Sequence, residues 1–464
     1  MYRKTDDQIH LFEILMEDNF KLDLENRWVK RAKAVPWELA EQKYSHMFKK
    51  NGRPAKQIRM ALGSLLIKEF LQCSDEEVVQ SILEQPYLQY FVGLKKFTTE
   101  APFDPSLMVW FRKRLSTKLI KEINEAMCKA EAMPKEVTEP EDDEGHGGTL
   151  IIDASCAPAD IKYPTDTGLL AEAIEKTDAM IDTMQEPLVG KQPRPRTYRK
   201  KSRKLYAGFV KQRKPSAKTI RRCRGKQLNY LKRNLNAVRK MRDSGGSLSG
   251  RQERMFDTIQ TLYEQQHQMH GSNTTRVDDR IVSLSQPHVR PIVRGKAGTP
   301  VEFGAKVNVS VVNGYTFISE ISYDAFYEGD YLENAIIDYY TCFGILPTRI
   351  LCDNAFINRD NRELCKDLKI GLSCKPLGRP PKEPAAVKTP KCTESRSEVE
   401  GRFGTLKTRY GWDRVMARLD NTGMSVISVA VLAMNLAKIA KLKVASLRFF
   451  LLNFLFSDCL CDCL

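Results

Sequence analysis

The chain has 464 residues, 42% of them hydrophobic and 28% charged, which fits a globular protein of more than one domain and excludes an intrinsically disordered chain. Lysine and arginine exceed aspartate and glutamate by 74 − 58 = 16, so we expect a polyanionic partner. The 12 cysteines show no CxxC pairs at zinc-finger spacing, and no secretory leader is visible. Both features predict reduced thiols in a cytoplasmic protein.

The first third of the chain has helical patterns throughout. Residues 1–131 therefore predict an all-α N-terminal domain. Ser74 with Glu77 three residues later predicts a capping box at the start of a helix. Asp104 followed by proline predicts the start of another helix, which we expect to run from Ser106 to Met127 without a break. The acidic stretch 132–148, which contains proline and glycine, predicts a linker.

A short β-branched run, TLIIDAS, follows the linker and predicts a buried strand that ends near Asp153. From residue 166 to about 293 the pattern is helical and basic. Between Lys191 and Arg242 there are 21 lysines or arginines and no acid, so the rest of the chain has a net charge of 53 − 58 = −5. This segment predicts binding to a phosphate backbone, with a solvated, self-repelling loop as the alternative.

The same basic segment also carries a helical apolar pattern. Its members are Leu228, Leu231, Leu235, Val238 and Met241. We therefore expect a helix with one buried face.

Strand patterns resume in residues 304–323, as two alternating runs around Asn313-Gly314 that predict a hairpin. An amphipathic helix (330–344), a strand followed by Asp353 and a short strand near 370–376 come next. After a proline-rich loop, the pattern predicts a helix around 396–411 and an apolar core helix at 424–442. This order predicts an α/β domain with a mixed sheet. The apolar, cysteine-containing tail 446–464 begins with the run SLRFFLLNFLF (446–456), which Arg448 and Asn453 interrupt. This run is shorter than the roughly 20 residues of a membrane span, so we expect a packing helix.

Glu400 lies on one helical face with Arg396 and Lys407, four residues before it and seven after it. Taken alone, this pattern fits a solvated face with an i,i+4 ion pair. Two strand-end aspartates change that reading, because three converging carboxylates suit hard divalent ions such as Mg²⁺. Two such ions, about 3.5–4 Å apart, activate a nucleophile and stabilise the leaving oxygen in phosphodiester chemistry. Arg396 and Lys407 would then bind neighbouring phosphates.

Each predicted acid has a competitor nearby. Asp160 or Asp166 could replace Asp153, but strand placement favours Asp153. Asp353 could instead cap the following helix, a role that Asn354 could share. Glu398 could replace Glu400, but it points about 160° away on the helical wheel.

Three stretches in the correct order closely resemble the DDE transposases of bacterial insertion sequences: LIIDASCAPADIKYPTDTGLL, ILCDNAFINRDNRELC…PLGRPPK and RSEVEGRFGTLKTRYGWDRVMARL. The helical stretch NGRPAKQIRMALGSLLIKEFLQCSDEEVVQSI is similar to the N-terminal domain of that family. The resemblance spans residues 20–445, approximately. It implies a ribonuclease-H-like catalytic domain over 149–445 with a helical basic insertion at about 166–293.

The resemblance also implies that Asp153, Asp353 and Glu400 bind two Mg²⁺ (or Mn²⁺) ions. Arg396, Glu400 and Lys407 match the R-x3-E-x6-K signature of the family. That signature normally has a tyrosine three residues before the arginine, and this chain has Thr393 there. The difference concerns a stacking or DNA-positioning contact rather than metal binding.

The function expected from this resemblance is transposition. The protein would bind terminal inverted repeats, cleave the DNA and join the 3′-OH end to target DNA, as a homodimer in the cytoplasm with the nucleoid and without a membrane. The residues expected to contact double-stranded DNA in the basic segment are Arg199, Lys200, Lys201, Arg203, Lys204, Arg221 and Arg222. An inactive DNA-binding derivative and a nuclease without strand transfer are the alternatives.

Overall fold

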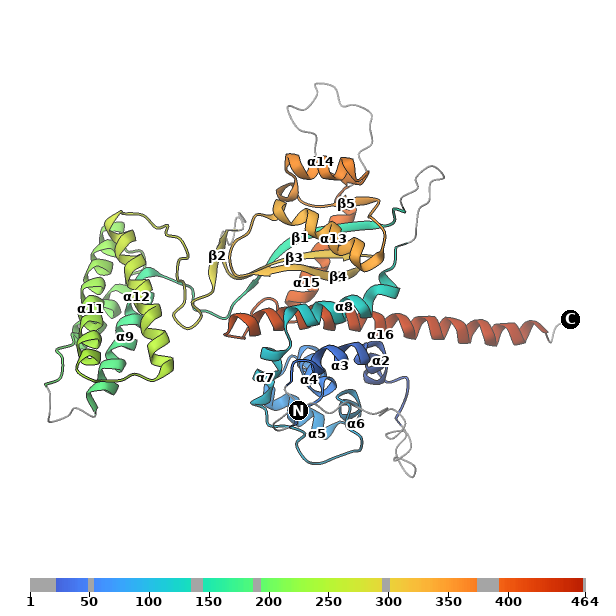
Figure 1. The fold of residues 1–464 in the computed structure, drawn as a ribbon, viewed down its shortest axis with the longest axis horizontal. Helices are drawn as coiled ribbons and strands as arrows, with labels where there is room; N and C mark the ends of the chain where they lie inside the picture. Colours follow the sequence, from blue (N-terminus) through green and yellow to red (C-terminus); the bar gives the residue numbers. More distant parts are fainter. Residues whose placement is uncertain are drawn as a thin grey trace, which may run out of the picture. The chain divides into compact units, whose positions relative to one another are not determined.

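The computed structural model describes residues 22–48, 54–134, 145–186, 193–293, 301–373 and 392–461, with side chains from 397 to 441 in the last range. The chain forms two compact units (Figure 1). Unit 1 comprises Met1–Pro158, Lys306–Ser322 and Phe326–Leu464. Unit 2 comprises Ala159–Ala305 and Tyr323–Ala325. The predicted proline-rich loop and the side chain of Arg396 lie outside the described residues.

Unit 1 begins with a group of short helices. They are α2 (Arg27–Ala34), α3 (Trp37–Ser45), α4 (Ile58–Leu71), α5 (Asp75–Glu84), α6 (Pro86–Phe91), α7 (Leu107–Arg114) and α8 (Thr117–Ala132). The predicted capping box is confirmed, because Glu77 N donates to Ser74 Oγ (3.2 Å) and Ser74 N donates to Glu77 Oε2 (2.7 Å). The prediction of one helix from Ser106 to Met127 is wrong. The helix breaks after Arg114 because Ser116 Oγ accepts from Leu119 N and caps a new helix.

The sheet is mixed, which confirms the predicted α/β class. Its strands are β4 (Tyr315–Ser322), β3 (Val301–Val312), β1 (Thr149–Pro158), β5 (Arg349–Leu351) and β6 (Gly371–Ser373), side by side in that order. All belong to unit 1 except the first residues of β3, up to Ala305. The pairs β1–β5 and β5–β6 are parallel, and β3–β4 is antiparallel. The predicted hairpin turn is confirmed at Asn313 (φ 49°) and Gly314 (φ 74°), where glycine and asparagine tolerate positive φ.

Four helices complete unit 1: α13 (Leu332–Phe343), α14 (Arg359–Asp367), α15 (Cys392–Arg409) and α16 (Asp420–Cys461). Helix α16 contacts α2, α4, α7 and α8 as well as β4, so it joins the N-terminal helices to the sheet (Figure 1). Asn435 on α16 donates to Thr316 O (2.7 Å) and to Asn124 Oδ1 (2.9 Å), which links α16, β4 and α8 in the core.

Helix α16 is the predicted apolar core helix, and it continues without a break past the predicted boundary at 445. Among the described residues, its segment Asp420–Lys441 is long and apolar enough to cross a membrane (hydropathy 1.7). However, 78% of that apolar window is buried inside the protein, as expected of a core helix.

Unit 2 contains the helices α9 (Asp166–Gln185), α10 (Arg199–Val210), α11 (Ala217–Asp243) and α12 (Gly250–Gly271). The predicted apolar face of α11 is confirmed, since its five members are buried against α9 and α12. The prediction of helix up to about residue 293 is wrong after Gly271, where α12 ends and turns follow. Residues Arg290–Val293 form strand β2, which pairs with the first residues of β3. Ile292 is buried there and Val293 is exposed, an alternation typical of a strand with one buried face.

Candidate active site and candidate nucleic-acid interface

Asp153 and Asp353 belong to neighbouring parallel strands in the same register. The last paired residues of β1 and β5 are Ile151 and Leu351, and each aspartate follows its strand's paired residue by two positions. Because parallel strands run in the same direction, both aspartates lie toward the same edge of the sheet. The two residues are 200 positions apart in the chain, so the strand pairing brings them together.

The prediction that the strand ends near Asp153 is wrong. Strand β1 continues to Pro158, because its other edge pairs with β3 beyond the point where β5 ends. The pairing of β1 with β5 ends at Ile151, two residues before Asp153.

The two aspartates make the same local contact. Asp153 Oδ1 accepts from Ala154 N (2.8 Å), and Asp353 Oδ1 accepts from Asn354 N (2.6 Å). Asp353 thereby caps the short helix η3 (Asn354–Phe356), so the capping role considered as its alternative is present. Both side chains are half-buried. A carboxylate has about four acceptor sites on its two oxygens, so this contact is compatible with metal binding.

Helix α15 packs against β1 and β5 through its buried residues Val399, Phe403 and Leu406. Glu400 lies on one flank of this buried stripe and is exposed, with Lys407 half-buried two turns further on. Glu398 lies on the other flank, where its Oε1 pairs with Arg402 (3.5 Å).

Asp153, Asp353 and Glu400 do not form a complete metal site in this structure. Carboxylates are the ligands that Mg²⁺ prefers, so the donor chemistry of Asp153, Asp353 and Glu400 fits a hard divalent ion. Yet no group of three or more His, Cys, Asp or Glu side chains in the described part of the chain is close enough to hold a metal. The structure thus places two acids at one strand edge and the third on a helix packed beside it, without a complete ligand group.

Asp166, the competitor of Asp153, has a different role. Its carboxylate accepts from Arg224 (3.1 Å), Arg280 (2.8 Å) and Gln266 (2.8 Å), which joins α9, α11, α12 and the segment after α12. A carboxylate with three such donors is a structural element of unit 2. Asp160 lies two residues beyond the end of β1.

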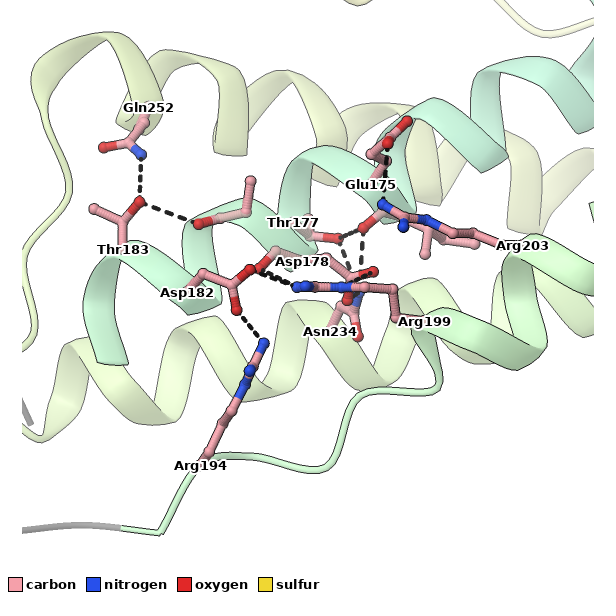
Figure 2. A network of polar contacts seen from close by, with 12 residues as sticks. Glu175, Thr177, Asp178, Asp182, Thr183, Arg194, Arg199, Arg203, Asn234 and Gln252 are labelled. Atoms are coloured by element: carbon pink, nitrogen blue, oxygen red, sulfur yellow. Dashed lines mark hydrogen bonds and ion pairs between the residues drawn. The ribbon is translucent and has the colours of Figure 1, made fainter. Parts of the chain in front are cut away.

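The predicted DNA contacts of α10 divide into two groups. Arg199 pairs with Asp178 (3.3 Å) and Asp182 (2.7 Å), and Arg203 pairs with Glu175 (3.2 Å), as Figure 2 shows. Burial raises the pKa of Asp178, and Arg199 and Asn234 oppose that rise. These arginines fasten α10 to α9.

The remaining predicted cations lie on the surface of unit 2. Lys200, Lys201, Lys204 and Arg222 are exposed and form no ion pair with a described residue. Arg221 is also exposed and donates to Asn273 Oδ1 (2.7 Å). Sequence reasoning missed Tyr198, around which Arg196 (5.4 Å), Lys201 (5.7 Å) and Arg233 (4.6 Å) gather. The sequence signal that could have identified Tyr198 is the presence of tyrosines within the basic segment between Lys191 and Arg242.

Two families of known proteins match parts of the chain. Residues 17–114 match a family described as "Transposase domain (DUF772)", and residues 350–437 match the family "Transposase DDE domain". The second match includes Asp353, Glu400 and Lys407, and a DDE domain implies a ribonuclease-H-like fold.

The chain is also similar to a curated protein. The uncharacterized protein ORF8 in the nfe locus of Rhizobium meliloti is 33% identical over 147 residues, which are 32% of this chain and 69% of that protein. No solved structure matches the chain. Transposases with a DDE domain act on DNA and depend on divalent metal ions. The chain therefore belongs to the DDE transposases of the insertion-sequence type.

Proposed function

We propose that this transposase cleaves DNA at the ends of a mobile element and joins the 3′-OH ends to target DNA, with Asp153, Asp353 and Glu400 as its metal-binding acids. The observation that carries the proposal is the shared register of Asp153 and Asp353 beside the Ile151–Leu351 pair. Helix α15, which carries Glu400, packs against both strands. Both observations support a ligand group of three hard oxygen donors, two from the strands and one from α15.

The role of each residue follows from its position. Bound Mg²⁺ or Mn²⁺ ions would activate the attacking oxygen and stabilise the leaving oxygen. Asp153 and Asp353 would hold the ions from the strands. Glu400 would complete the ligand group, because its exposed side chain can change rotamer without breaking a packed contact. Lys407 would bind a phosphate next to the scissile bond, from the same helical face as Glu400.

A strand-transfer assay tests this function. The full chain is incubated with a duplex that carries a pre-cut 3′-OH end of its own element, together with a target plasmid and Mg²⁺. We expect a joined product, which disappears with a chelator and returns when Mg²⁺ or Mn²⁺ is added in excess. Hydrolysis of intact ends without joining would identify a nuclease. DNA binding without either reaction would identify an inactive derivative, and each of these two results would overturn the proposal.

A further inference from the structure

Helix α11 has one buried face and one exposed face. Leu228, Leu231, Leu235 and Val238 are buried against the other helices of unit 2. The opposite face is exposed over most of the 27-residue helix. Asp243, the last residue, is the one acid in α11.

The exposed face has a defined composition. At about 100° per residue, Asn229 and Asn236 point within roughly 20° of each other along its centre line. Lys218, Arg222 and Lys240 continue this line before and after the asparagines. Further cations lie about 50–70° to either side of it. Lys226 and Arg233 are on one side, and Lys232 and Arg239 are on the other.

Asn229 and Asn236 make few hydrogen bonds within the protein. Asn229 makes no hydrogen bond to a described residue, and Asn236 accepts one long bond, from Arg239 (3.4 Å). Asn234 on the buried face shows the contrast (Figure 2), because its amide donates to Thr177 Oγ1 (3.1 Å) and Asp178 Oδ1 (3.0 Å). Since asparagine is a poorer helix former than alanine, two exposed asparagines lower the stability of α11 without a compensating contact.

The segment that leads into α10 lies beside the exposed face of α11, next to Arg233. The Arg233 guanidinium lies over the ring of Tyr198, 4.6 Å from its centroid, and Tyr230 packs beside Tyr198 (5.9 Å). The adjoining hollow, of about 500 Å³, is lined by residues Arg194 to Lys201 and by no acidic side chain. Arg194 and Arg199 of this lining pair with Asp182 on α9. Arg196, Lys200 and Lys201 form no ion pair with a described residue, so these three cations favour a polyanion at this side.

We propose that α11 is a DNA-reading helix, in which Asn229 and Asn236 contact adenines in the major groove of double-stranded DNA while the flanking cations bind the phosphates of both strands. An asparagine amide pairs with both the N6 and N7 atoms of adenine. Seven helical residues rise about 10.5 Å, which matches three base pairs at about 3.4 Å each. The inference rests on the proposed action on DNA and does not depend on cleavage.

Selection from a random duplex library tests this helix. The full chain selects duplexes without divalent metal, so that binding is measured without chemistry. We expect enrichment of adenine at two positions about three base pairs apart in the selected duplexes. Asn229→Ala should lose the preference at one position and Asn236→Ala at the other, each by about 5- to 100-fold. Gln268→Ala, an exposed amide on α12, is the matched control and should keep both preferences.

The cations supply a second readout. The double variant Lys226→Gln/Arg233→Gln should weaken binding to all sequences alike and reduce the log–log salt slope by about 1.8. Unchanged base preferences in both asparagine variants, with helical content shown to be intact, would overturn the inference. A wild-type chain without base preference would also overturn it. Failure of strand transfer with the preferences intact would count against the proposed function and leave α11 as the reading helix.

Discussion

Glu398 Oε1 lies 3.5 Å from Arg402 Nη2, one turn further along α15, and beside the Asn313-Gly314 turn. This pair occupies the flank of α15 opposite Glu400. Replacing each glutamate by glutamine therefore separates a structural acid from a catalytic one. Glu398→Gln should lower the free energy of unfolding by no more than about 0.5 kcal/mol and preserve DNA cleavage. Glu400→Gln should abolish cleavage at unchanged stability. If Glu398→Gln lost as much activity as Glu400→Gln, the acid of α15 would be wrongly assigned.

The lysines of α10 should contribute to DNA binding without contributing to stability. Replacing Lys200, Lys201 and Lys204 with glutamine removes at most three phosphate contacts. The log–log salt slope of DNA binding should then fall by up to about 2.7. An unchanged slope, on protein shown to be folded, would remove these lysines from the DNA interface.

Arg199 should behave in the opposite way. Arg199→Gln leaves the Asp178 carboxylate, whose side chain is 5% exposed, without its cation. We expect the free energy of unfolding to fall by about 1–3 kcal/mol, measured by urea denaturation. Lys200→Gln serves as the neighbouring control and should leave stability within about 0.5 kcal/mol of wild type. Equal effects of the two variants would contradict the structural role of Arg199.

Asp166 should be a stability residue rather than a catalytic one. Asp166→Asn removes the charge that compensates Arg224, whose side chain is 8% exposed, and Arg280. Breaking such a pair should lower the free energy of unfolding by about 2–4 kcal/mol. The exposed Asp257→Asn on α12 is the matched control and should have little effect. Full stability together with lost cleavage would instead place Asp166 in the active site.

Burial raises the pKa of Glu69 on α4 to about 8, against the opposing effects of Lys68, Gln72 and Arg112. The folded protein therefore keeps this proton in the range where the unfolded chain releases it. Stability should be greatest below the unfolded pKa of 4.5 and should fall as pH rises toward about 8, with a slope approaching about 1.4 kcal/mol per pH unit from this residue.

Glu69→Gln should remove this contribution, because the amide stays neutral. Urea denaturation between pH 5 and 8 compares the two proteins. The wild type should lose more stability than the variant over this range. Parallel pH profiles would show that Glu69 is ionised in the folded state.

Local signals in the sequence predicted the local features of the fold. The Ser74–Glu77 capping box and the Asn313-Gly314 turn each depend on residues a few positions apart, and both appear as predicted. The break at Ser116 carried a capping signal too, but the apolar pattern continued through it and hid the break. The extension of β1 beyond Asp153 depends on pairing with β3, which is remote in the sequence.

At the candidate nucleic-acid interface, too, the sequence did not predict features that depend on residues remote in the chain. A basic run predicts an anionic partner, but it does not distinguish Arg199, which pairs with Asp178 and Asp182, from the exposed Lys200 beside it. That distinction needs the acids of α9, which the fold places next to α10. Helical phase did separate Glu400 from Glu398, because both lie on one helix and their relative direction depends on local geometry.

Metal-dependent cleavage by three single variants tests the central claim most directly. Asp153→Ala, Asp353→Ala and Glu400→Ala are assayed with Mg²⁺ and with Mn²⁺ on a duplex that carries the ends of the element, and DNA affinity is measured in parallel. We expect each variant to lose cleavage with both ions and to bind DNA nearly as well as the wild type, because each change removes a metal ligand from unit 1 and leaves the cations of unit 2 intact. Wild-type cleavage by any one of the three variants would contradict the account for that residue.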